Sequence, residues 1–164
     1  MDEETLKIIR DVHSIFTEKG LKLSVAESCT GGLISHYLTW LPGASRFFEA
    51  GAVTYSVSSK EKLLGISPET IARCGVISRE TAKEMAEKIR LITRTDYALS
   101  TTGNLGPDLL EGKERGLVYV AISKEGKTII KELRLKGART RNKEEAALSA
   151  LRFLRNELSH VEKS

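Results

Sequence analysis

The alternation of helix-type and strand-type segments constrains the fold of this chain more than any other feature. Apolar residues recur at helical spacing over residues 3–18, and a strand-like segment, residues 21–26, follows directly. Residues 97–101 and 117–122 are also strand-like, and the second of these is continuously apolar, as a strand buried on both faces would be. Interleaved helices and strands predict an α/β fold, a three-layer α/β/α sandwich.

The remaining segments predict the type of sheet. Residues 47–55 are expected to form a further strand, and residues 129–135 an edge strand after a turn at Gly126. Because that turn indicates a hairpin, we predict a mixed, mostly parallel sheet of about five strands. Further helices are expected from about Gly31 to Trp40, from a cap at Ser58 or Ser59 to Leu64, after a cap at Ser78, and after an Asn142–Glu145 capping box.

Length and composition indicate an ordinary water-soluble domain. The 164 residues suit a single domain over residues 1–164. Two cysteines are too few for a disulfide scaffold, so a reducing compartment is expected. No run approaches the roughly eighteen apolar residues that a membrane helix needs, and the acidic, amphipathic start resembles no targeting peptide. We therefore expect a cytoplasmic protein without a membrane partner.

The charge pattern favours a small anionic ligand over nucleic acid. The net charge is +4 and the sequence pI is near 9.1. Basic residues alternate with acidic ones along the predicted helices, which is typical of solvated faces. Aromatic residues make up 5% of the chain, too few for base-stacking platforms. The same positive charge would suit a small phosphorylated ligand.

Ser28 lies in the most informative segment, Ala26-Glu27-Ser28-Cys29-Thr30-Gly31-Gly32, which has the pattern of a strand, a turn and a helix start. Such a turn directs backbone N–H groups at one point, which suits an anion or oxyanion. The glycines, Gly31 and Gly32, allow a substrate to approach the backbone closely. Ser28 is thus a candidate nucleophile. Alternatively, Ser28 or Thr30 is only a helix cap.

Lys60 is the best candidate base for such a serine. All three histidines fall on predicted helices, and no Ser/His/Asp arrangement or metal-binding spacing such as HxH, HExxH or CxxC is present. Lys60 lies one short loop beyond a predicted strand and follows Tyr55 closely. The alternative is a solvated lysine at a helix start, which is the commoner situation.

Two further segments are candidates for binding. The stretch Ser100–Asp108, which includes Thr102 and Gly103, ends a predicted strand. Ligands of open α/β sheets bind outside the carboxyl ends of strands, so this loop is expected to share a site with Ser28 unless it is an ordinary turn. Arg139 precedes the last helix, where an arginine is suited to phosphate, although it is also a common surface residue.

Together these segments resemble the CinA C-terminal domain family, whose characterised members include nicotinamide-nucleotide amidases. The matching stretches are AESCTGGLISHYLT, PGASRFFEAGAVTYS, the lysine within SSKEKLLGIS, CGVIS, TGNLGPD, GLVYVAI and ARTRNKEEAALSALRFL. The resemblance implies a three-layer fold, a small nucleotide as substrate and no cofactor. It also leads us to expect a homo-oligomer, with a dimer favoured.

The resemblance assigns roles to individual residues. It implies that Ser28 and Lys60 are catalytic, together with Tyr55 of the TYS segment. It further implies that substrate is bound by the remaining residues of these motifs: Thr30, Gly31, Gly32, Thr102, Gly103 and Arg139. The expected reaction is hydrolysis of the carboxamide of nicotinamide mononucleotide through an acyl-enzyme.

The chain departs from the family pattern in the loop that would contact substrate. It has Asn104-Leu105 where Ile-Ala is usual, Leu109–Gly112 where two glycines are common, and Lys143 where arginine is common. Two alternatives therefore stay open. One is a non-catalytic nucleotide-sensing or protein-interaction domain. The other is a hydrolase with Cys29 as nucleophile, in a nitrilase-like trio with Glu27 and Lys60.

Overall fold

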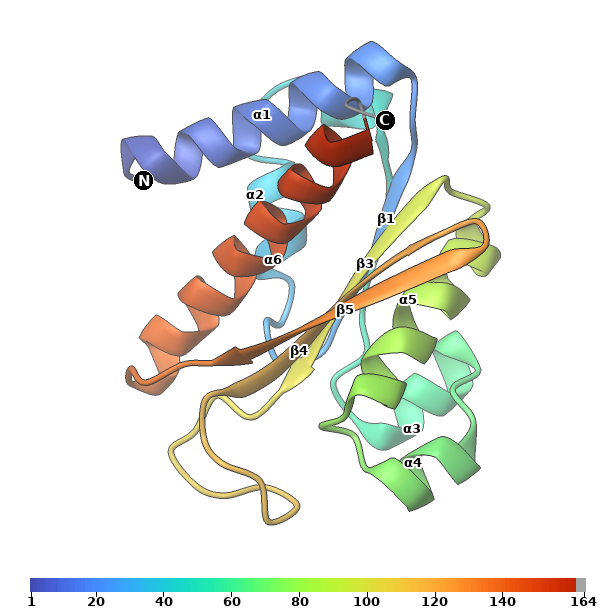
Figure 1. The fold of residues 1–164 in the computed structure, drawn as a ribbon, viewed down its shortest axis with the longest axis vertical. Helices are drawn as coiled ribbons and strands as arrows, with labels where there is room; N and C mark the ends of the chain where they lie inside the picture. The colour runs from blue at the N-terminus through green and yellow to red at the C-terminus, as the bar shows by residue number, and fades with distance from the viewer. Residues whose placement is uncertain (162–164) are drawn as a thin grey trace.

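A single mixed sheet forms the middle layer of the computed structural model, which describes residues 1–161 (Figure 1). The five strands lie in the order β2-β1-β3-β4-β5. Their bounds are Leu23–Glu27 (β1), Phe48–Val53 (β2), Tyr97–Gly103 (β3), Leu117–Lys124 (β4) and Lys127–Arg134 (β5). β1 pairs in parallel with β2 and β3, whereas β3–β4 and β4–β5 are antiparallel. The predicted mixed sheet is confirmed, with equal numbers of parallel and antiparallel pairings.

Helices cover both faces of this sheet, so the predicted three-layer α/β/α architecture is confirmed (Figure 1). One face carries α1 (Glu3–Lys19), α2 (Leu33–Leu38) and α6 (Arg139–Val161). The other carries α3 (Val57–Ser59), α4 (Pro68–Cys74) and α5 (Arg79–Thr93). Two short turns complete the elements, η1 (Ala44–Arg46) and the π-helical η2 (Lys60–Leu64).

The core lies between the sheet and its two helical layers. On the α6 side, Val120 and Ile122 of β4 join one buried cluster with Leu151 and Leu154. On the other side, the predicted inward face of α5 is buried, and it consists of Ala82, Met85, Ala86 and Ile89. Burial of apolar area on both faces, at about 25 cal/mol per Å², holds the strands in one register.

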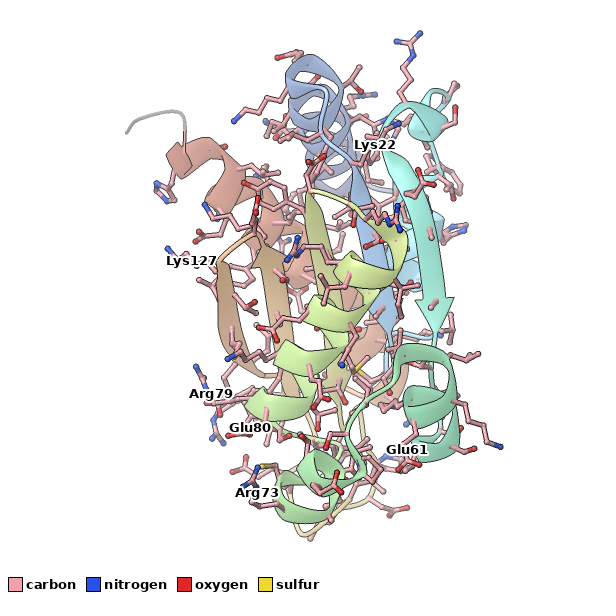
Figure 2. All side chains as sticks on the ribbon, turned by 90° about the vertical axis from the view of Figure 1, so that its right-hand side faces the viewer. Lys22, Glu61, Arg73, Arg79, Glu80 and Lys127 are labelled. Carbon is pink, nitrogen blue, oxygen red and sulfur yellow. The ribbon has the colours of Figure 1, made fainter. Side chains whose placement is uncertain are left out.

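The outer face of α5 is polar and solvated, as its mixed charges predict. Arg79 and Glu80 project from the first turn of this helix (Figure 2). Lys83 and Glu87 form an i,i+4 pair, with 4.0 Å between Nζ and Oε1. None of the helices in residues 1–161 is both long and apolar enough to cross a membrane.

Three helix starts differ from the sequence prediction. α2 begins at Leu33 because Gly31 and Gly32 have φ values of +60° and +100°, outside the helical region. α3 is capped by Ser56, whose side chain accepts from the Ser59 amide, so the predicted caps at Ser58 or Ser59 were wrong. α4 was not predicted, although Pro68 in its first turn is a helix-start signal.

The predicted Asn142–Glu145 capping box was also wrong. α6 begins at Arg139, so Asn142 lies inside the helix. Its side chain accepts from the Gly137 amide at 2.8 Å and donates to the Leu105 carbonyl at 3.1 Å. Asn142 therefore ties the start of α6 to the loop after β3 rather than capping the helix.

Candidate active site

The carboxyl ends of the parallel strands bring the candidate residues to one edge of the sheet. Ser28 follows β1, Tyr55 follows β2 by one residue, and β3 ends in Thr102 and Gly103. A cavity of about 190 Å³ lies at this edge. Six residues singled out from the sequence line it: Ser28, Tyr55, Lys60, Thr102, Gly103 and Arg139. The SCTGG segment and the loop after β3 thus share a site, as expected.

Ser28 and Lys60 form a buried pair. Lys60 Nζ lies 2.8 Å from Ser28 Oγ, and the two residues are 0% and 7% exposed, respectively. Burial disfavours the ammonium form and lowers the pKa of Lys60 from 10.5 to about 8. The lysine is therefore not the solvated residue that a helix start between serines suggests. It has the contact and the acidity that a base for Ser28 requires.

Lys60 owes its position to the turn between β2 and η2. Its backbone N–H donates to the Ser56 carbonyl at 3.1 Å. Its Nζ also lies 2.6 Å from the Thr54 carbonyl and 3.2 Å from the Tyr55 carbonyl. The π-helical turn begins at Lys60 itself, in keeping with the frequent occurrence of such turns at functional sites.

Glu27 fixes the turn that carries Ser28, a role that the sequence analysis missed. This fully buried carboxylate accepts from the amides of Ile34 (2.9 Å) and Ser35 (3.0 Å) in the first turn of α2. It also accepts from the hydroxyls of Thr30 (2.7 Å) and Ser35 (2.8 Å). A carboxylate at a helix start is electrostatically favourable. The signal was available, because a glutamate at the buried end of a strand needs donors nearby.

Neither Ser28 nor Thr30 caps α2, because the cap residue is Gly32 and its contacts are made by Glu27 instead. Thr30 is fully buried, and its hydroxyl lies 2.8 Å from that of Thr101, away from the residues lining the cavity. We find Thr30 in the support of the turn, whereas the sequence placed it among the substrate contacts.

Gly31 and Gly32 make the sharp turn before α2 and do not line the cavity. A Cβ on Gly31 would lie 3.2 Å from Lys143 Nζ, so this glycine also leaves room for the lysine. Lys143 is the residue that stands where arginine is common in the family, and it places a positive charge beside this turn.

Cys29 is buried beside Ser28, and desolvation raises the pKa of its thiol to about 12. A thiol of this acidity carries almost no thiolate near neutral pH, and thiolate is the nucleophile. The carboxylate of Glu27 is meanwhile occupied by four donors. These observations argue against a nitrilase-like trio of Glu27, Cys29 and Lys60.

Arg139 and Tyr55 meet across the rim of the cavity. Arg139 Nη2 donates to the Tyr55 hydroxyl at 2.9 Å, and Nη1 donates to the Gly106 carbonyl at 2.6 Å. The Tyr55 ring is largely exposed, and its hydroxyl faces Arg139 rather than the Ser28–Lys60 pair. The guanidinium therefore offers a positioned positive charge at the rim.

Thr102 and Gly103 shape the cavity wall. The Thr102 hydroxyl donates to the Val76 carbonyl at 2.8 Å, which joins β3 to the start of α5. A Cβ on Gly103 would lie 2.6 Å from the Leu117 carbonyl oxygen and 2.7 Å from Val118 Cα. Gly103 is thus required by the packing of β4. No group of His, Cys, Asp or Glu side chains within residues 1–161 is arranged to hold a metal ion.

Comparison with known proteins identifies the family. The model of the CinA C-terminal domain matches residues 5–158. The chain belongs to the CinA C-terminal domain family. A protein of Caldanaerobacter subterraneus subsp. tengcongensis, named as competence-damage inducible, is 43% identical over 159 residues, which cover 96% of this chain and 38% of that protein. The chain therefore spans about 38% of the length of such relatives.

Solved structures of the family share the fold. The competence damage-inducible protein A of Klebsiella pneumoniae is 29% identical, with a TM-score of 0.93 over 95% of this chain and 98% of that one. The competence/damage inducible protein CihA of Agrobacterium tumefaciens is 34% identical, with a TM-score of 0.91 over 97% and 98% of the two chains. These names refer to competence and damage, and they specify no chemical reaction.

Proposed function

We propose that this CinA-family chain hydrolyses the carboxamide of nicotinamide mononucleotide to nicotinate mononucleotide and ammonia. The observation that carries the proposal is the buried contact of 2.8 Å between Lys60 Nζ and Ser28 Oγ, in a lysine whose pKa falls to about 8. A serine activated by a neutral lysine is suited to acyl transfer from an amide. The family membership and the arginine at the rim support a nucleotide as the substrate.

Neutral Lys60 donates its two N–H groups to the Thr54 and Tyr55 carbonyls, which leaves its lone pair facing Ser28 Oγ. As Oγ attacks the carboxamide carbon, its proton passes to Nζ. The amide of Cys29, the residue after the nucleophile, is our candidate donor to the oxyanion. The Lys60 ammonium then protonates the amide nitrogen, the C–N bond breaks, and ammonia leaves an ester on Ser28.

A water molecule completes the cycle. Lys60, neutral again, takes a proton from the water as its oxygen attacks the ester carbon. The bond between that carbon and Ser28 Oγ breaks, and Lys60 returns the proton to Oγ. The carboxylic acid product loses its own proton to solvent. No cofactor takes part in these steps, and Arg139 holds the 5′-phosphate with Tyr55 covering the ribose side.

The experiment is to incubate the protein with nicotinamide mononucleotide and to measure ammonia together with nicotinate mononucleotide. Ser28→Ala should release neither, while its melting temperature stays close to that of the wild type. Ser58→Ala is the matched control: this serine is exposed on α3, two residues before Lys60, and its loss should leave turnover unchanged. Turnover in Ser28→Ala would refute the assignment of the nucleophile.

A non-catalytic nucleotide-binding or protein-interaction domain is the second candidate. Leu109 and Leu110 favour it, because both are more than half exposed and Leu110 lies at the cavity. Exposed leucines of this kind suit contact with another protein. Binding of nicotinamide mononucleotide without release of ammonia would support this candidate. A homodimer remains our prediction for either function, and the mass in solution tests it.

A further inference from the structure

Glu111 places a carboxylate in the wall of the active-site cavity. It belongs to the loop between β3 and β4, in the segment that departs from the family pattern. Its backbone has φ +55°, a left-handed conformation that side chains other than glycine seldom adopt. Its Oε1 accepts from the Val76 amide at 2.8 Å. The carboxylate is therefore held in place rather than free in solvent.

The surrounding residues are arranged around this carboxylate. A Cβ on Gly75 would lie 2.0 Å from Oε2, so only glycine leaves the space. Lys113 Nζ lies 3.2 Å from Oε2 and also donates to the carbonyls of Cys74 and Ile77. Val76 and Ile77 line the same cavity as Ser28. The loop is thus fastened to the α4–α5 junction with a negative charge at the cavity.

The fixed charges of the cavity have opposite signs. Three of its lining residues are charged, namely Lys60, Glu111 and Arg139. Lys60 is neutral in the form that takes the serine proton, which leaves one negative and one positive group. The field of Glu111 reaches the reacting centre, because its charge acts to raise the pKa of Lys60 against the larger effect of burial. A ligand with a phosphate and a separate positive charge is complementary to this pair.

We propose that Glu111 makes the site selective for a carboxamide carried on a cationic ring, and that it disfavours the carboxylate product. This inference rests on the proposed amidase function. The pyridinium ring of the substrate is attracted to Glu111, while the phosphate binds Arg139. Hydrolysis then replaces a neutral carboxamide with a carboxylate beside Ser28, in the same cavity as the carboxylate of Glu111. The repulsion between these two anions assists release of the product.

The test compares two ligands that differ in ring charge. Oxidised nicotinamide mononucleotide has a cationic ring, and its reduced form has a neutral ring with the same carboxamide, ribose and phosphate. Affinities are measured by calorimetry in Ser28→Ala, which prevents turnover, with and without Glu111→Gln. A partly exposed charge pair is worth roughly fivefold in affinity. Glu111→Gln should thus weaken the oxidised form about fivefold and the reduced form by less than about twofold.

Product binding provides a second measurement. Glu111→Gln should improve the affinity for nicotinate mononucleotide relative to that for nicotinamide mononucleotide, by about fivefold. Glu114→Gln is the matched control, because Glu114 lies in the same loop, pairs with Arg134 at 2.9 Å and does not line the cavity. It should change none of these affinities.

The outcomes separate this inference from the proposed function. If Glu111→Gln weakens both ring forms equally, Glu111 only anchors the loop and the inference is wrong. If the wild type releases no ammonia, the amidase proposal is wrong, and the two affinities still decide whether Glu111 selects for a cation. If neither ligand binds, both proposals are refuted.

Discussion

Removal of the Lys60 charge should change how the stability of the protein depends on pH. The pKa of this lysine is about 8 in the folded chain, against 10.5 for an unperturbed lysine. The difference of about 2.5 units, at 1.36 kcal/mol each, corresponds to about 3 kcal/mol. Because the folded-state pKa is lowered, this cost is fully present below about pH 8. It disappears as pH rises toward 10.5, where the unfolded chain also loses the proton.

Lys60→Met isolates this contribution, since methionine fills similar space without a titrating group. The free energy of unfolding is measured by urea denaturation between pH 7 and pH 10.5 for both proteins. Stability of the wild type should rise relative to the variant by about 3 kcal/mol over this interval. The tyrosines Tyr37, Tyr97 and Tyr119, whose pKa values burial raises, titrate in both proteins and cancel in the difference.

The slope is the decisive quantity, because its sign is independent of the contacts that methionine loses. Loss of the donor to the Thr54 carbonyl costs about 1–3 kcal/mol at every pH and only offsets the curve. The same lysine should govern catalysis, so kcat/KM should rise with pH through an apparent pKa of about 8. A difference between the two proteins that is flat from pH 7 to 10.5 would refute the argument.

Three further substitutions test individual roles. Lys60→Arg should lower kcat/KM by about 10²–10⁴-fold, because arginine keeps its proton; a steady-state assay with nearly full activity would exclude the lysine as base. Cys29→Ser should keep activity within about threefold, since a thiol with a pKa of about 12 is not the nucleophile, and complete loss would contradict this. Arg139→Ala should raise KM for nicotinamide mononucleotide about tenfold and leave nicotinamide riboside nearly unaffected; equal effects on both substrates would show that Arg139 does not bind the phosphate.

The fold could be predicted because its main signals are local. The apolar run over residues 117–122 forms β4, and the helical spacing after Ser78 forms α5 with the predicted inward face. The meeting of the Ser28 and Thr102 segments followed from a general rule about the carboxyl ends of parallel strands. These predictions needed only the order of the elements.

The environment of Lys60 could not be predicted in the same way. The sequence around it is charged and hydroxyl-rich, which is typical of an exposed helix start. Its burial results from the π-helical turn and from two carbonyls of the preceding loop. Likewise, Arg139 meets Tyr55 across a sequence separation of 84 residues. Neither contact leaves a periodic signal, because both depend on how distant segments pack.

Glu27 was missed for a related reason. Its partners Ile34 and Ser35 lie seven and eight residues ahead, beyond the reach of the local capping patterns. The two positive-φ glycines bring them back onto the carboxylate. A motif resemblance identifies such a residue as part of a segment, but it does not say that the residue holds the turn.

The two buried ionisable groups beside the nucleophile explain why proton transfer is possible at this position. Glu27 accepts four hydrogen bonds and has no role that requires it to change protonation. Lys60 has three partners, which match the three donors of an ammonium group. After loss of a proton, the amine still serves both carbonyls, and its lone pair can accept from the Ser28 hydroxyl. Neither protonation state leaves a buried polar group without a partner, so a proton can move between Ser28 and Lys60 without the penalty of about 1–3 kcal/mol for an unsatisfied group.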